Sequence, residues 1–225
     1  MVDSFNDSIA VANWPIRWYD GNCRACPRLA GFLDEVKSEN NRYFCKPVPP
    51  FGDPVARLLV VGLAPGKHGA NATGRPFTGD YAGDLLYQTL HKFGFATRPV
   101  SLSADDGLEL VNCRITNAVK CLPPQNKPVG DEEKTCNHFL TAEMSEPSLK
   151  VILALGLLAH RSILRSYGMK LSKYKFGHNN VHRLDNGISL VNSYHCSRYN
   201  TQTKRLTTQM FEQVFETIRS EINLD

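Results

Sequence analysis

The sequence has no long apolar run. Its 225 residues are 42% hydrophobic and 21% charged, and no stretch approaches the roughly 20 apolar residues that span a bilayer. The N-terminal residues lack a basic segment followed by an apolar one, and we find no internal repeat and no low-complexity tract. These absences predict a globular cytoplasmic protein with no membrane partner.

A strong charge of either sign is also missing, and so are the common nucleotide-binding motifs. The net charge of +4 permits a polyanionic partner without demanding one. Gly66 and Lys67 lie in a glycine-rich stretch, but its spacing differs from that of a phosphate-binding P-loop and no Ser or Thr follows the lysine. The GxGxxG pattern of a dinucleotide site is absent as well.

The seven cysteines are an odd number and do not suggest a set of disulfides. Cys23 and Cys26 form a CxxC pair, and Cys121 and Cys136 form a second pair with a long spacing. Four thiolates suit either Zn²⁺ or a [4Fe–4S] cluster. The Pro-rich, polar segment between Cys121 and Cys136 is typical of a loop. At this point zinc, a cluster and unrelated buried thiols all remain open.

Four short apolar runs, rich in β-branched residues, predict strands over 58–63, 111–119, 151–155 and 188–191. Helical periodicity predicts one helix from near Tyr81 to Gly94 and two more over 157–167 and 204–222. Alternating strands and helices predict a three-layer α/β/α fold around a central, mostly parallel four-stranded sheet. We expect residues 1–225 to form a single domain.

Polar residues follow these predicted strands. Ligands of open parallel sheets bind beyond the carboxyl ends of the strands. That edge would gather the loop 62–80, Asn117, Gly156 and the segment from Tyr194 to Ser197. Within the loop, Phe77 lies among small residues and offers a flat face for a planar ring.

Asp80 and His195 each allow a structural interpretation. Asp80 precedes the predicted helix and is typical of an N-cap residue. A single histidine is more often structural than catalytic, but His195 shares its predicted edge with Asn117 and Asp80. The residues alone therefore indicate a polar binding site without deciding its chemistry.

Three motifs in order, GLAPGKHGANATGRPFTGD, ITNAVKCLPPQNKP and SYHCSRYNTQTKRLT, resemble the uracil-DNA glycosylase superfamily. The similarity spans roughly residues 20–210 and is strongest to family 5, the iron–sulfur type-b enzymes. Leu63 replaces the Glu that is typical of family 4. The resemblance implies a monofunctional enzyme of bacterial or archaeal origin that removes uracil and other deaminated or modified bases from double-stranded DNA.

The resemblance also implies roles for individual residues. Asp80 would orient the attacking water, His195 would stabilise the leaving base, and Asn117 would read the base edge or hold a water. Loop 195–205 would fill the space left by the flipped nucleotide. The residues implied in substrate binding are Gly62, Ala64, His68, Phe77, Ser197, Arg198 and Tyr199.

For the cysteines, the resemblance favours a structural [4Fe–4S] cluster held by Cys23, Cys26, Cys121 and Cys136. The N-terminal segment, about residues 1–50, would then contribute cluster ligands to the single domain. We expect a monomer. Two alternatives stay open: an iron–sulfur protein that binds DNA lesions without hydrolysis, and a family 4-like glycosylase with a narrower substrate range.

Overall fold

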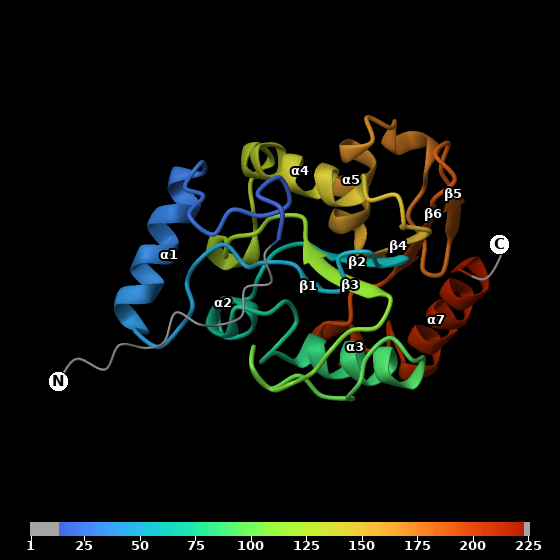
Figure 1. The fold of residues 1–225 in the computed structure, drawn as a ribbon, viewed down its shortest axis with the longest axis horizontal. Coiled ribbons are helices and arrows are strands. Elements are labelled where there is room, and N and C mark those ends of the chain that lie inside the picture. The colour runs from blue at the N-terminus through green and yellow to red at the C-terminus, as the bar shows by residue number, and fades with distance from the viewer. Residues whose placement is uncertain (1–13, 223–225) are drawn as a thin grey trace.

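The computed structural model describes residues 14–222, and its centre is one six-stranded sheet (Figure 1). The strands are β1 (Phe51–Gly52), β2 (Leu58–Gly62), β3 (Cys113–Asn117), β4 (Val151–Leu155), β5 (Val181–Arg183) and β6 (Ser189–Ser193), in the order β1-β3-β2-β4-β6-β5. The inner strands β3, β2, β4 and β6 pair in parallel, and β1 and β5 pair antiparallel at the two edges.

The predicted parallel core is confirmed, but the sheet has six strands where the sequence predicted four. Every residue of the inner strands is buried, because helices cover both faces. The two edge strands are only two and three residues long, and β5 is largely exposed. Such short, polar segments carry no apolar run that would mark them as strands.

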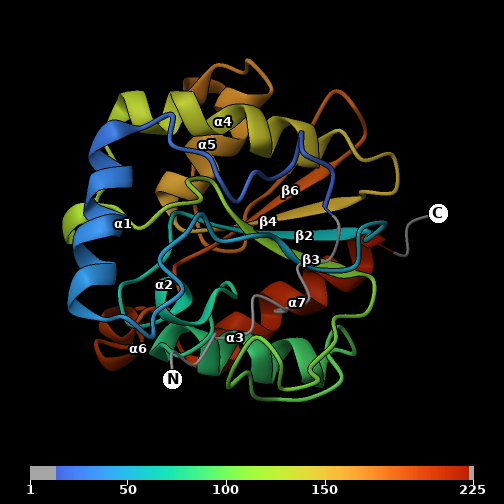
Figure 2. The same cartoon turned by 60° about the vertical axis from the view of Figure 1, so that its left-hand side comes forward.

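The helices form layers on both faces of the sheet. They are α1 (Pro27–Glu39), α2 (Ala70–Thr73), α3 (Tyr81–Lys92), α4 (Gly130–Met144), α5 (Leu157–Ser166), α6 (Arg198–Gln202) and α7 (Thr208–Ile222), with short 3-10 turns at Pro124–Asn126 and Leu171–Lys173. Figure 2 shows α4 and α5 over one face and α3 and α7 over the other. Within the described part of the chain, no helix is long and apolar enough to cross a membrane.

The ends of the predicted helices are set by local hydrogen bonds and backbone angles. Helix α3 begins at Tyr81 and ends at Lys92, and Gly94 follows it with φ +81°. The helix predicted from residue 204 begins instead at Thr208. Lys204 has φ +57°, which no helix tolerates, and the Thr207 hydroxyl accepts the Met210 N–H at 3.2 Å.

Helix α4 was not predicted, and it corrects the expectation of a loop between Cys121 and Cys136. Cys121 lies in a loop, but Cys136 lies on α4. The helix starts where Glu132 accepts the Val129 N–H at 2.9 Å and pairs with Arg28 of α1 at 2.7 Å. Three acidic residues in its first turn were the available sequence signal.

The carboxyl ends of the four inner strands lie at one edge of the sheet, as expected. Gly62, the last residue of β2, pairs with Asn117, the last residue of β3. Backbone pairing continues one step further, from the Ala118 N–H to the Gly62 carbonyl at 2.9 Å. The N-terminal segment predicted to contribute cluster ligands comprises about residues 1–50. Its residues 1–13 lie outside the described residues.

Candidate active site

Gly62 brings two predicted site residues together. A Cβ placed on Gly62 would lie 2.4 Å from Asn117 Oδ1 and 2.7 Å from Phe77 Cζ. Only a residue without a side chain therefore allows both groups to approach the end of β2. Asn117 is buried, and its amide offers both a donor and an acceptor at this point.

The Phe77 ring is held by an unusual backbone. Phe77 is buried and has φ +54°, a left-handed conformation that costs a non-glycine residue energy. The Tyr87 hydroxyl donates to the Pro76 carbonyl at 2.8 Å. A Cβ on Gly83 would lie 1.9 Å from the Phe77 carbonyl oxygen, so α3 packs directly on this backbone. The Phe77 ring faces His195 at 6.0 Å between ring centres.

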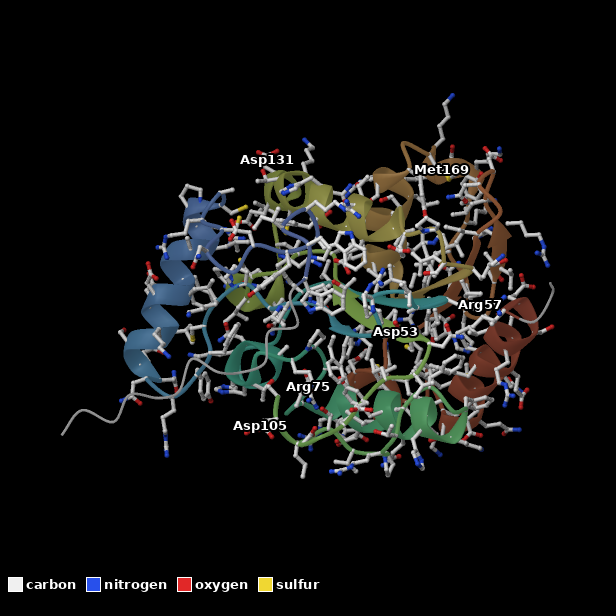
Figure 3. All side chains as sticks on the ribbon, viewed as in Figure 1. Asp53, Arg57, Arg75, Asp105, Asp131 and Met169 are labelled. Carbon is white, nitrogen blue, oxygen red and sulfur yellow. The ribbon has the colours of Figure 1, made fainter. Side chains whose placement is uncertain are left out.

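Arg75 anchors the same loop to the segment 101–106, and the sequence did not single it out. Its guanidinium donates to Asp106 at 2.7 Å, Ser101 at 3.0 Å and the Ala104 carbonyl at 2.8 Å, and it lies 4.2 Å from the centre of the Phe51 ring. Figure 3 labels Arg75 beside the loop that carries Asp105. Burial alone would raise the pKa of Asp106, but hydrogen bonds from the Leu108 amide and Arg75 hold it at about 2.

Asp80 caps α3 with one carboxylate oxygen, which accepts the Gly83 N–H at 3.1 Å. The other oxygen lies against glycines: a Cβ would meet it at 2.4 Å on Gly69 and at 3.7 Å on Gly66. Burial raises the pKa of Asp80, and backbone hydrogen bonds from α3 oppose part of that rise. The cap therefore uses only Oδ1, and Oδ2 faces Gly66 and Gly69 of the glycine-rich loop.

His195 follows β6 and lies beside Gly156, where a Cβ would be 3.5 Å from the His195 Cβ. Burial lowers the pKa of His195, so its imidazole is neutral at pH 7. Asn200 fixes the backbone here by donating from Nδ2 to the His195 carbonyl at 2.8 Å. A neutral imidazole can donate one hydrogen bond from a defined nitrogen.

The remaining predicted substrate residues have different surroundings. His68 is exposed, and its Nδ1 lies 2.8 Å from the Tyr43 hydroxyl. Ser197 caps the short helix α6, whose first residues Arg198 and Tyr199 are exposed. Ala64 lies apart from the Phe77 ring, against an apolar cluster that contains Val119, Phe139 and Cys136.

The four predicted cysteine ligands line a single pocket. Cys23, Cys26, Cys121 and Cys136 share it with apolar side chains, among them Leu29, Val119 and Phe139. Burial raises the pKa of Cys121 to about 12 and that of Cys136 to about 11. Across residues 14–222, no group of three or more His, Cys, Asp or Glu side chains is arranged to hold a single metal ion. Cys45, Cys113 and Cys196 do not line this pocket.

A family model described as the uracil DNA glycosylase superfamily matches residues 49–219. The chain therefore belongs to the uracil-DNA glycosylase superfamily, as its three motifs indicated. Within the superfamily it is similar to type-5 uracil-DNA glycosylases. It is 45% identical to that of Thermus thermophilus over 198 residues, covering 85% of this chain and 90% of the relative.

Other type-5 relatives come from distant organisms. The Mycobacterium tuberculosis protein is 44% identical over 202 residues, which cover 86% of this chain and 75% of the relative. The Pyrobaculum aerophilum protein is 39% identical over 218 residues, which cover 92% of this chain and 94% of the relative. Bacterial and archaeal members therefore align with nearly the whole of this chain.

Proposed function

We propose that this chain is a monofunctional type-5-like uracil-DNA glycosylase. It hydrolyses the N-glycosidic bond of uracil, and of other deaminated or modified bases, in double-stranded DNA and leaves an abasic site. One observation carries the proposal within the family: Gly62 makes room for Asn117 and Phe77 at the carboxyl edge of the sheet, and the Phe77 ring lies beside that of His195. The substrate is the DNA of a bacterial or archaeal cell.

The grouping of Asn117, Phe77 and His195 is suited to a base taken out of the duplex. A stacked base is inaccessible, so the nucleotide must flip at a cost of about a few kcal/mol, and less at a mispair such as U·G. In our proposal the ring of Phe77 stacks on the flipped base and the Asn117 amide reads its polar edge. Contacts such as that of the Tyr87 hydroxyl with the Pro76 carbonyl hold the strained backbone of Phe77 and so fix the ring before the substrate arrives.

In the proposed chemistry, two residues each stabilise one of the charges that develop on the substrate. As the glycosidic bond breaks, negative charge develops on the leaving base and positive charge on the sugar. Neutral His195 donates a hydrogen bond to a carbonyl oxygen of the base and stabilises the negative charge. Asp80 Oδ2 orients the attacking water and stabilises the oxocarbenium-like sugar. Hydrogen bonding to the α3 amide keeps the carboxylate directed while it does so.

The chemistry of the cysteine pocket suits an iron–sulfur cluster. Four thiols line one space together with apolar side chains such as Leu29, Val119 and Phe139. Cysteine thiolates are the usual ligands of a [4Fe–4S] cluster. We propose that Cys23, Cys26, Cys121 and Cys136 hold it. When bound, the cluster cross-links the N-terminal segment to the loop after β3 and to α4, within a single monomeric domain.

We call residues 195–205 the insertion loop. Its short helix α6 presents Arg198 and Tyr199 to solvent, and Tyr199 is 71% exposed. A large exposed aromatic side chain next to a base pocket is suited to filling the space that a flipped nucleotide leaves. We propose that Tyr199 or Arg198 enters the duplex there.

The test is direct. The protein is incubated with a duplex that contains one U·G pair, and alkali then cleaves any abasic site. We expect strand cleavage at the uracil and none in a matched T·A duplex. An uncut U·G strand at stoichiometric protein would refute the proposal. If the same protein shifted that duplex in a gel, the result would favour a lesion-binding protein without hydrolytic activity.

A further inference from the structure

The two ends of the insertion loop meet at one aromatic ring. Tyr194 immediately precedes the loop, and the guanidinium carbon of Arg205, its last residue, lies 4.7 Å from the centre of the Tyr194 ring. The His178 ring stacks on the same tyrosine, with 5.0 Å between ring centres and 21° between planes. His178 belongs to none of the three motifs.

His178 also joins separate parts of the chain by hydrogen bonds. The Tyr194 N–H donates to His178 Nδ1 at 3.2 Å, and His178 Nε2 lies 3.3 Å from the Met210 carbonyl of α7. Because Nδ1 accepts, the proton of the neutral ring is on Nε2 and is donated to Met210. One imidazole therefore ties the end of β6 to α7.

The insertion loop has a defined internal structure between these ends. Asn200 donates to the His195 carbonyl at 2.8 Å and accepts the Leu206 N–H at 3.0 Å. These bonds fix the direction of α6, which carries Arg198 and Tyr199. The shape of the loop is consequently established at its base, by groups that lie away from the exposed tip.

We propose that His178, Tyr194 and Arg205 are positioning residues that hold the insertion loop in the shape that enters duplex DNA. The inference rests on the proposed function. A loop fixed before binding loses less conformational entropy when it enters the duplex. The stack is therefore important for double-stranded substrate, in which a base must be flipped and its space filled. It is much less important for uracil in single-stranded DNA, in which no stack has to be opened.

The first measurement is the ratio of uracil excision rates on duplex and single-stranded DNA under single-turnover conditions. Tyr194→Leu removes the ring, and we expect the ratio to fall about tenfold, since it loses both ring contacts. Tyr194→Phe keeps the ring and should restore the ratio to within about twofold of wild type. Lys173→Met is the matched control, because it removes an exposed cation 5.4 Å from the Tyr174 ring, outside the loop.

Arg205→Lys separates stacking from charge. Lysine keeps the positive charge but lacks the planar guanidinium. We expect a fall in the ratio of about two- to fivefold, the value of an exposed cation–π contact. A ratio equal to that of wild type would mean that Arg205 acts through charge alone and would overturn its place in the stack.

His178 is tested by two variants. His178→Asn places an amide oxygen near the position of Nδ1 and keeps an acceptor for the Tyr194 N–H, whereas His178→Leu leaves that N–H unpaired. We expect His178→Asn to retain more of the duplex-to-single-strand ratio than His178→Leu. Equal ratios in both variants and wild type would overturn the role of His178.

Trypsin susceptibility tests the stack independently of activity, because Arg198 and Lys204 are cleavage sites within the loop. We expect Tyr194→Leu to be cut there at least about tenfold faster than wild type, as its loop opens locally. If trypsin cut Tyr194→Leu fast and the wild-type protein did not excise uracil, the proposed function would be refuted and the stack supported. An active wild type with unchanged ratios and unchanged cutting in Tyr194→Leu would refute the stack alone.

Discussion

Gly62→Ala is the most informative substitution in the candidate active site. A Cβ at this position would stand 2.4 Å from Asn117 Oδ1 and 2.7 Å from Phe77 Cζ. The oxygen contact is about 1 Å shorter than an ordinary van der Waals contact, so Asn117 or Phe77 must move by that amount. Misplacement of a substrate-positioning group by about 1 Å costs on the order of 100-fold in rate.

The expected loss of stability is smaller than the loss of activity. Gly62 has no left-handed backbone angle, so alanine introduces no backbone strain. Overpacking a buried position typically costs about 1–3 kcal/mol, part of which the two side chains relieve by moving. We therefore expect a folded protein whose single-turnover excision of uracil from a U·G duplex is on the order of 100-fold slower.

Gly31→Ala is the matched control. A Cβ on Gly31 would meet nothing within 4 Å, and the residue lies inside α1. It should leave excision unchanged and stabilise the protein by about 0.5–1 kcal/mol, because alanine favours helix. If Gly62→Ala excised uracil within about threefold of wild type while folded, the convergence of Asn117 and Phe77 would not form the working pocket.

Three further predictions concern other parts of the molecule. Asp80→Asn keeps an N-cap of similar strength but removes the charge, so excision should fall by at least about 100-fold with little change in melting temperature; a comparable fall in melting temperature would mean that Asp80 only caps α3. Cys136→Ala should lose the brown iron–sulfur absorption together with soluble protein, whereas Cys45→Ala, outside the cysteine pocket, should keep the colour. The pKa of Asp106 is lowered from 3.8 to about 2, so its stabilising effect is complete above pH 4 and is lost as the pH falls toward 2; urea unfolding against pH should show this loss in wild type and not in Asp106→Asn.

The parallel core of this fold was predictable because burial on both faces forces continuous apolar runs. The strands β2 and β4 have such runs, whereas β3 and β6 combine shorter apolar stretches with buried polar residues such as Arg114 and Asn192. The carboxyl ends of these parallel strands then had to share one edge. The edge strands β1 and β5 and the helices α1, α2, α4 and α6 were missed. Each of these elements is short, polar or weakly periodic, and α1 and α4 are joined by the tertiary contact between Arg28 and Glu132.

The site was predictable as a set of residues but not as a geometry. Motif order identified Asn117, Phe77 and His195, and strand topology placed them at one edge. No sequence rule predicts that Phe77 adopts φ +54° or that Arg75 is buried, because these features depend on residues distant in sequence. The Tyr87 hydroxyl bonds the carbonyl before Phe77, and Asp106 pairs with Arg75. The long loop after β2 is therefore fixed by the buried ion pair between Arg75 and Asp106. Its small residues leave room for neighbouring groups to approach.

The cysteine pocket and the proposed base site are built on adjacent backbone, so a cluster bound in the cysteine pocket would affect the proposed site. The backbone after β3 continues from Asn117 to Cys121, and the Val119 N–H donates to the Leu63 carbonyl at 2.8 Å. Ala64, two residues beyond Gly62, packs against the apolar side chains that include Val119 and Cys136.

The N-terminal segment reaches the same loop from the other side. The Phe44 and Cys45 amides donate to the carbonyls of Ala72 and Asn71 in α2, at 3.1 and 3.0 Å. Cross-linking this segment through four cysteines would therefore restrain both the loop that carries Phe77 and the end of β3 that carries Asn117. A cluster at this position would thereby act on excision through structure, by fixing two segments of the proposed base site.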